Sequence, residues 1–280
     1  MADKAILFDA TRCTACRGCQ SACKQWNEND EFIPTKENGV RVTNRGSYEN
    51  PPDLSPQTWL KMAFREVERK GTVDWLFTRR SCMHCTDAGC VRACPNGTLY
   101  HNEWGTVSYN KNTCTGCGYC VDACPFDVPR LSGNGIIGIA KMDKCSFCTT
   151  PALDRIEEGL SPACVKTCPP KALLYDDRDK MVALGQERVA TLKARGYSNA
   201  YLYGEKELGG LHVLYVFGDS PAVYGLPANP QISAATIAWK DIIQPLGWAL
   251  GGLTLLGLGL NFIVAREAKL AKELPGKKEE

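Results

Sequence analysis

Sixteen cysteines stand in four groups of four along this 280-residue chain, and no cysteine lies outside a group. Thiol groups at this density serve three chemistries: disulfide bonding, zinc binding and iron–sulfur cluster binding. The spacing within each group therefore decides between them. The groups are Cys13, Cys16, Cys19 and Cys23; Cys82, Cys85, Cys90 and Cys94; Cys114, Cys117, Cys120 and Cys124; and Cys145, Cys148, Cys164 and Cys168.

The first and third groups have the spacing C-x-x-C-x-x-C-x-x-x-C, which is the run found in bacterial ferredoxins. Such a tight loop can surround three corners of a cubane, whereas zinc is normally held by two separated cysteine pairs. Disulfide frameworks are typical of much shorter chains with a signal peptide, and residues 1–9 have no long apolar stretch. We therefore predict four 4Fe-4S clusters, with structural zinc and disulfides as the alternatives.

In a two-cluster ferredoxin, the last cysteine of each run binds the neighbouring cluster. Groups two and three are joined by a short predicted hairpin, 99–108, and so are expected to be partners, which leaves groups one and four to pair. The ligand sets predicted on this hypothesis are Cys13, Cys16, Cys19 and Cys168; Cys145, Cys148, Cys164 and Cys23; Cys82, Cys85, Cys90 and Cys124; and Cys114, Cys117, Cys120 and Cys94.

This pairing predicts an α+β fold in which one ferredoxin-like two-cluster module is inserted in another, followed by a single transmembrane helix. Further patterns predict strands at 59–67 and 73–77 around a turn at 70–71, a helix at 179–195 through Met181, Leu184, Val189 and Leu192, and a strand at 211–217. The expected domains are 1–26 with 133–178 (outer module), 27–81 (an insert that packs on a partner), 82–132 (inner module), 179–238 (extension and linker), 239–266 (transmembrane helix) and 267–280 (charged tail).

Residues 242–265 carry no formal charge. At about 1.5 Å per residue these 24 residues reach about 36 Å, enough to cross a bilayer core of about 30 Å. Trp239 and Trp248 stand where an interfacial aromatic belt is expected. The alternative is a buried helix of a soluble protein. Five basic residues follow the span and only Lys240 closely precedes it, so we expect a cytoplasmic C-terminus and an external cluster body, exported by a partner that carries the signal.

Composition and missing motifs indicate a carrier of electrons rather than a catalyst. A net charge of +2 does not favour nucleic acid as a partner. None of the three histidines lies in the predicted span, which excludes bis-histidine haem ligation by this helix. We expect His84, between two ligands, to be a partly exposed loop residue rather than a hydrogen-bond donor to a cluster. No phosphate-binding loop, nucleophile elbow or zinc-hydrolase helix is found.

Several stretches resemble the iron–sulfur beta subunits of respiratory, membrane-bound formate dehydrogenases, and the similarity runs over essentially the whole chain. They are CMHC at 82–85, CTGCGYC at 114–120, CPF at 124–126, PACVKTCP at 162–169, LKARGY at 192–197 and GLP at 225–227. The cysteine runs alone also fit beta subunits of other molybdopterin oxidoreductases or of hydrogenases, and a stand-alone membrane-tethered polyferredoxin. The LKARGY motif and the C-terminal anchor favour the formate type.

The resemblance implies a hetero-oligomer in the bacterial inner membrane. It implies an alpha subunit with a molybdenum or tungsten pterin site, and a gamma subunit with b-type haems that reduces quinone. It also implies that this chain is exported with the alpha subunit on a twin-arginine signal, which agrees with the charge asymmetry around the span.

Overall fold

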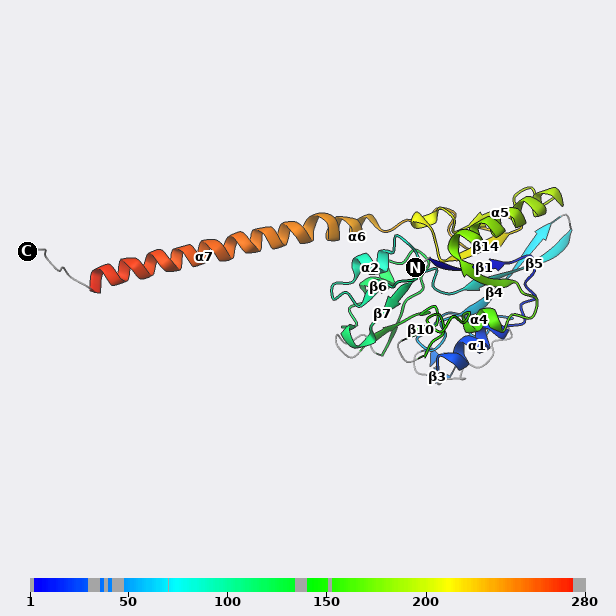
Figure 1. Cartoon of the computed structure of the whole chain (residues 1–280), viewed down its shortest axis with the longest axis horizontal. Coiled ribbons are helices and arrows are strands. Elements are labelled where there is room, and N and C mark those ends of the chain that lie inside the picture. The colour runs from blue at the N-terminus through cyan, green and yellow to red at the C-terminus, as the bar shows by residue number, and fades with distance from the viewer. Residues whose placement is uncertain are drawn as a thin grey trace, which may run out of the picture. The chain divides into compact units, whose positions relative to one another are not determined.

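A computed structural model describes residues 3–29, 36–37, 40–41, 48–69, 71–133, 140–150 and 153–273 (Figure 1). The chain divides into two compact units, Met1–Ser233 and Ala234–Glu280. The strands are β1 Lys4–Asp9, β2 Lys36–Glu37, β3 Val40–Arg41, β4 Lys61–Arg69, β5 Thr72–Arg80, β6 Leu99–His101, β7 Val107–Tyr109, β8 Arg130–Ser132, β9 Lys141–Asp143, β10 Thr149–Thr150, β11 Leu153–Asp154, β12 Leu173–Asp177, β13 Tyr201–Tyr203 and β14 Val213–Phe217. The helices of the first unit are α1 Gly18–Trp26, α2 Gly89–Ala93, α3 Tyr119–Asp122, α4 Ala163–Lys166 and α5 Arg178–Ala194, with short 3-10 turns at Lys111–Thr113 and Glu207–Gly209.

A four-stranded sheet, in the order β12-β1-β14-β13, forms the centre of the first unit. Strand β1 is apolar on both faces, as expected for a strand covered on both sides. On one face, Ala5 and Leu7 pack with residues of α5, and on the other, Ile6 and Phe8 join the core that contains many of the cysteines. The predicted helix and strand are confirmed by α5 and β14.

One detail of the predicted helix face is wrong. Leu184 is 37% exposed, whereas the neighbouring Gly185 is buried. A Cβ atom on Gly185 would lie 2.6 Å from Cδ1 of Leu202, so the helix approaches the sheet at this glycine. Close backbone packing, which an apolar pattern cannot reveal, therefore sets the orientation of α5.

The pairing of β1 with β12 brings the two ends of the first unit's cysteine region together. The strands are antiparallel, with Lys4 opposite Asp177 and Phe8 opposite Leu173. The Nζ atom of Lys4 lies 2.6 Å from Oδ1 of Asp177. Since β1 directly precedes group one and β12 directly follows group four, these groups are held at the same end of the paired strands.

The short helices that contain cysteines pack in pairs. Helix α1 packs against α4, and α2 packs against α3. Between α2 and α3, strands β6 and β7 form the predicted antiparallel hairpin, with Tyr100 opposite Ser108. The chain thus places group one beside group four, and group two beside group three.

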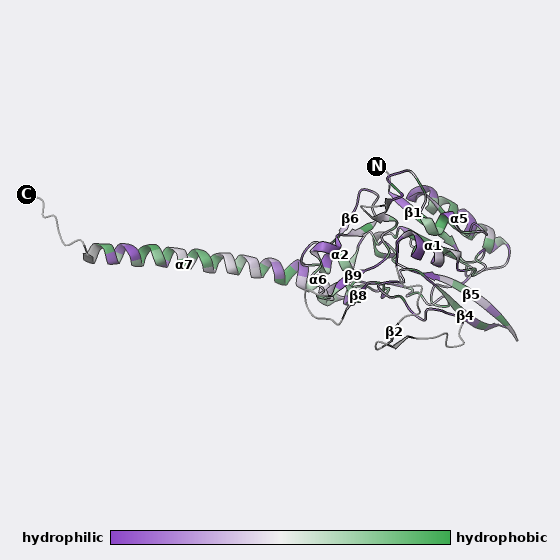
Figure 2. Ribbon diagram, turned by 90° about the horizontal axis from the view of Figure 1, so that it is seen from below, coloured by the Kyte–Doolittle hydropathy of each residue, from purple (hydrophilic) through white to green (hydrophobic). Residues whose placement is uncertain are grey.

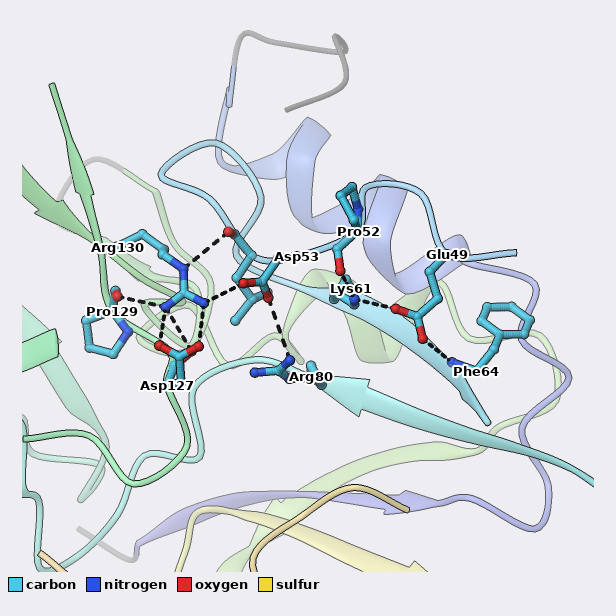
Figure 3. Close-up of polar contacts among 10 residues, drawn as sticks. Glu49, Pro52, Asp53, Lys61, Phe64, Arg80, Asp127, Pro129 and Arg130 are labelled. Carbon is cyan, nitrogen blue, oxygen red and sulfur yellow. Dashed lines mark hydrogen bonds and ion pairs between the residues drawn. The ribbon is translucent and has the colours of Figure 1, made fainter. Parts of the chain in front are cut away.

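Strands β4 and β5 form the predicted hairpin, although Lys70 of its turn lies outside the described residues. Its base contributes Leu60 and Met62 to the core, whereas Val73 and Trp75 near the tip are exposed. An ion pair attaches the segment before the hairpin to the body: Arg130 lies 2.9 Å from Asp53 (Figure 3). Within the insert, the buried Lys61 of β4 lies 2.5 Å from Glu49.

The second unit is a long helix composed of α6 Ala234–Ala238, a π-helical turn at Trp239–Ile243 and α7 Gln244–Glu273. Residues Ala234–Leu270 are long and apolar enough to cross a membrane, and none of their most apolar stretch is buried in the protein. Figure 2 shows hydrophobic colouring along most of α7, with hydrophilic colouring at its ends. The alternative of a buried soluble helix is therefore not supported.

Candidate metal centres

Cys23, at the end of group one, lies beside three cysteines of group four. A pocket is lined by Cys23, Cys145, Cys148 and Cys164, all of which are buried. Burial raises the pKa of Cys23, and electrostatic repulsion from the three group-four sulfurs raises it further. The pocket therefore presents four thiol groups from two distant segments to one shared space.

Cys94, at the end of group two, has a similar place beside group three. A second pocket is lined by Cys94, Cys114, Cys117 and Cys120. Burial, followed by repulsion from the other three cysteines of this pocket, raises the pKa of Cys120 to about 12. Burial alone would raise the pKa of Cys94, but hydrogen bonds from Leu99, Thr98 and Asn96 outweigh it and lower the pKa. Cys94 is therefore surrounded by donors that stabilise a thiolate.

Cysteines of groups one and two likewise have the last cysteine of another group among their electrostatic neighbours. Burial raises the pKa of Cys13 to about 11, and Cys168 is the charged neighbour that raises it most. Burial raises the pKa of Cys85, and repulsion from Cys82, Cys124 and Cys90 adds to this effect. Within the described ranges, no three His, Cys, Asp or Glu side chains converge tightly enough to hold a single metal ion.

Left-handed backbone turns and amide donors shape the ligand loops. Ala15 and Arg17, between the cysteines of group one, have φ values of 52° and 61°. The amide nitrogens of Ala15 and Met142 lie 3.4 Å from the sulfurs of Cys13 and Cys114, and that of Phe147 lies 3.5 Å from the sulfur of Cys145. Hydrogen bonds of this kind stabilise negative charge on a ligand sulfur.

Two buried charged residues near the cysteines, Arg79 and Lys144, were missed by sequence reasoning. Arg79 is 1% exposed, and its Nη2 donates to the Cys164 sulfur at 3.9 Å. Burial alone would lower the pKa of Arg79, but the surrounding cysteines and Tyr215 raise it above its ordinary value. Lys144 is also 1% exposed, and its Nζ donates to the carbonyl oxygen of Cys145 at 3.0 Å. The alternation of side chains along β5 could have indicated that Arg79 points inward.

The expectation that His84 is partly exposed is wrong, because it is fully buried. Its Nδ1 accepts a hydrogen bond from the Val107 amide at 3.2 Å, and Nε2 has no partner among the described residues. Burial, with the nearby charge of Lys144, lowers its pKa well below the ordinary value. His84 is therefore a neutral residue of the interior.

Two family models, each described as a 4Fe-4S dicluster domain, match residues 12–98 and 73–178. The iron–sulfur subunit of formate dehydrogenase-O from Escherichia coli (strain K12) is 43% identical over 246 residues, which cover 86% of this chain and 77% of that protein. The chain belongs to the family of formate dehydrogenase iron–sulfur subunits. The formate dehydrogenase iron–sulfur subunit of Haemophilus influenzae is 40% identical over 90% of this chain and 77% of its own length. The hydrogenase-2 operon protein HybA of Escherichia coli O157:H7 is 29% identical over 90% of this chain and 83% of its own.

Members of this family are non-catalytic subunits of an oxidoreductase, and this chain is an electron-transfer subunit with four 4Fe-4S clusters. The predicted chemistry, family and cofactor are thus confirmed. The residues present fit such clusters, since cysteines from paired segments line common pockets that also receive amide donors. When bound, each cluster takes up and releases one electron.

Proposed function

We propose that this chain is the beta subunit of a respiratory formate dehydrogenase. It carries electrons from a catalytic alpha subunit with a molybdenum or tungsten pterin site to a cytochrome b gamma subunit, which reduces quinone in the bacterial inner membrane. Family membership supports the formate assignment, and the apolar helix Ala234–Leu270 supports attachment to a membrane.

The proposal includes the exchanged ligand sets. Cys23 binds with Cys145, Cys148 and Cys164, and Cys168 binds with Cys13, Cys16 and Cys19. Cys94 binds with Cys114, Cys117 and Cys120, and Cys124 binds with Cys82, Cys85 and Cys90. The observation that carries it is that each of two pockets is lined by three cysteines of one group and the last cysteine of another. The packing of α1 on α4 and of α2 on α3 supports the two nested modules, 1–26 with 133–178 and 82–132.

Electrostatic interactions between the ligand sets support a single row of clusters. Cys19 of the first set has Cys164 of the second as its foremost charged neighbour. Besides burial, repulsion from Cys145 of the second set raises the pKa of Cys82 of the third. Besides burial, repulsion from Cys120 of the fourth set raises the pKa of Cys90 of the third. The row therefore runs from the set of Cys13 to the set of Cys114, with the junction of the two modules at its middle.

The insert, 27–81, is proposed to contact the alpha subunit through its described outer part. Although its base belongs to the chain's own core, Tyr48, Val73 and Trp75 are each between 46% and 57% exposed. Tyr48 and Trp75 also pack together, with ring centroids 4.7 Å apart. An exposed aromatic cluster of this kind is typical of a protein interface.

The proposed orientation places the C-terminus in the cytoplasm and the cluster body in the periplasm. Arg266 and Lys269 follow the apolar stretch, in agreement with the positive-inside rule. In spheroplasts, a tag at the C-terminus is expected to resist added protease while the cluster body is digested. Digestion of the tag with protection of the body would contradict this orientation.

Purification of the intact membrane complex tests the function as a whole. We expect the full-length chain to copurify anaerobically with a formate-oxidising pterin subunit and a cytochrome b, and to contain about sixteen irons with matching sulfide. Iron absent from the anaerobic protein would contradict the cluster assignment. The similarity to HybA favours a hydrogenase partner as the second candidate, which would be identified by a copurifying subunit that oxidises hydrogen instead of formate.

A further inference from the structure

Arg79 is a buried cation held among cysteines. It is 1% exposed and lines the pocket of Cys23, Cys145, Cys148 and Cys164. Its Nη1 donates to Oγ of Ser81, and its Nη2 lies 3.9 Å from the sulfur of Cys164. Its Nε atom has no hydrogen-bond partner among the described residues.

A guanidinium stays protonated at all accessible pH values, so Arg79 brings a permanent positive charge into the interior. A buried charge requires a compensating charge of opposite sign. Four thiolates give a 4Fe-4S cluster a net negative charge, and reduction adds one more. The cluster proposed for this pocket is therefore the natural counter-ion of Arg79, and the attraction is stronger in its reduced form.

We propose that Arg79 raises the reduction potential of the cluster bound by Cys145, Cys148, Cys164 and Cys23. This inference rests on the proposed ligand sets. Arg79 is a positioning residue and binds no metal. Its positive charge and its contact with the Cys164 sulfur stabilise the additional electron on the cluster. Because β5 belongs to the insert, a segment outside the four cysteine groups sets the potential within one module.

The neighbouring residue provides a matched control. Arg80 has the same charge and the same strand, but its side chain is 30% exposed and lies 3.6 Å from Asp53 (Figure 3). Alternation along a strand directs consecutive side chains to opposite faces. Arg80→Gln therefore removes the same net charge from the protein without removing it from the pocket.

The test is a reductive titration, followed by electron paramagnetic resonance, of the full-length chain purified anaerobically in detergent with the subunits that copurify. The affected signal is assigned by its change in Cys23→Ala. We expect Arg79→Gln to lower the equilibrium constant for reduction of that cluster at least tenfold, which is about 59 mV for a one-electron couple. Arg79→Lys, which keeps the charge, and Arg80→Gln are expected to stay within about threefold of the wild type, a shift of about 28 mV.

The outcomes separate the two proposals. A wild-type chain without iron contradicts the ligand sets. Normal iron with an unchanged potential in Arg79→Gln, or an equal drop in Arg79→Lys, overturns only the role of Arg79. If Arg79→Gln does not hold its clusters, Arg79→Lys decides: normal iron and potential support a role for charge, whereas lost iron or a lowered potential overturns it.

Discussion

The imidazole ring of His84 packs edge-to-face against the phenyl ring of Phe147, with the ring centroids 5.0 Å apart. His84 lies between Cys82 and Cys85, and Phe147 lies between Cys145 and Cys148. Both side chains are buried. This contact therefore joins the loop of cysteine group two to the loop of cysteine group four.

Phe147→Ala is expected to lower the free energy of unfolding by about 3–5 kcal/mol, because it leaves a cavity at this junction. Tyr197→Ala, at a side chain that is 48% exposed, is expected to change it by less than about 0.5 kcal/mol. Urea unfolding of the anaerobic protein, followed by far-ultraviolet circular dichroism, measures both. Equal losses in the two variants would show that the junction contributes no special stability.

Cys94→Ala is expected to alter the cluster of Cys114, Cys117 and Cys120 and to leave that of Cys82, Cys85 and Cys90 intact. The reason is that Cys94 lines the group-three pocket. Electron paramagnetic resonance of the reduced variant measures this, and Cys124→Ala serves as the reciprocal control, with the other cluster altered. If Cys94→Ala damaged the cluster of its own group, the exchanged ligand sets would be wrong.

Gly116→Ala is expected to impair assembly of the group-three cluster. Gly116 has φ +72°, and a Cβ atom there would lie 2.4 Å from the carbonyl oxygen of Ala140, so the ligand loop would have to move. Gly118→Ala is the control, since it also has a positive φ, of +84°, but its nearest contact would be 3.7 Å away. We expect it to cost about 1–2 kcal/mol and to retain its iron. Iron analysis distinguishes the two, and equal iron loss would point to backbone strain alone.

The stability of the protein is expected to fall as the pH is lowered through about 6.5. Nδ1 of His212 lies 2.7 Å from the carbonyl oxygen of Lys4, and burial lowers the pKa of this histidine below its ordinary value. Below about pH 6.5 the unfolded chain binds a proton that folded His212 does not, until the pH reaches the lower pKa of the folded state. Proton binding to His212 in the unfolded chain therefore lowers the free energy of unfolding by at most about 1.4 kcal/mol per pH unit in this window.

His212→Gln is expected to flatten this dependence in urea unfolding between about pH 7.5 and 5.5. Part of the slope remains, because burial lowers the pKa of His84 as well. A slope that is the same in His212→Gln and the wild type would contradict this account.

Local spacing in the sequence determined the chemistry, the short elements and the apolar span. A C-x-x-C-x-x-C run places its sulfurs around a cluster by chain geometry alone, and the hairpin at β6–β7 and helix α5 follow from patterns a few residues long. The charge-free stretch 242–265 is likewise visible in composition. Each of these features depends on residues close together in the chain.

The tertiary structure alone decided how the segments meet. Lys4 and Asp177 pair across 173 residues, and Arg79 reaches the Cys164 sulfur across 85. The packing of distant segments also buries His84, exposes Leu184 and places Cys23 beside three cysteines of group four. The physical reason is that contacts between distant segments depend on the packing of whole elements, which leaves no periodic trace in the local sequence.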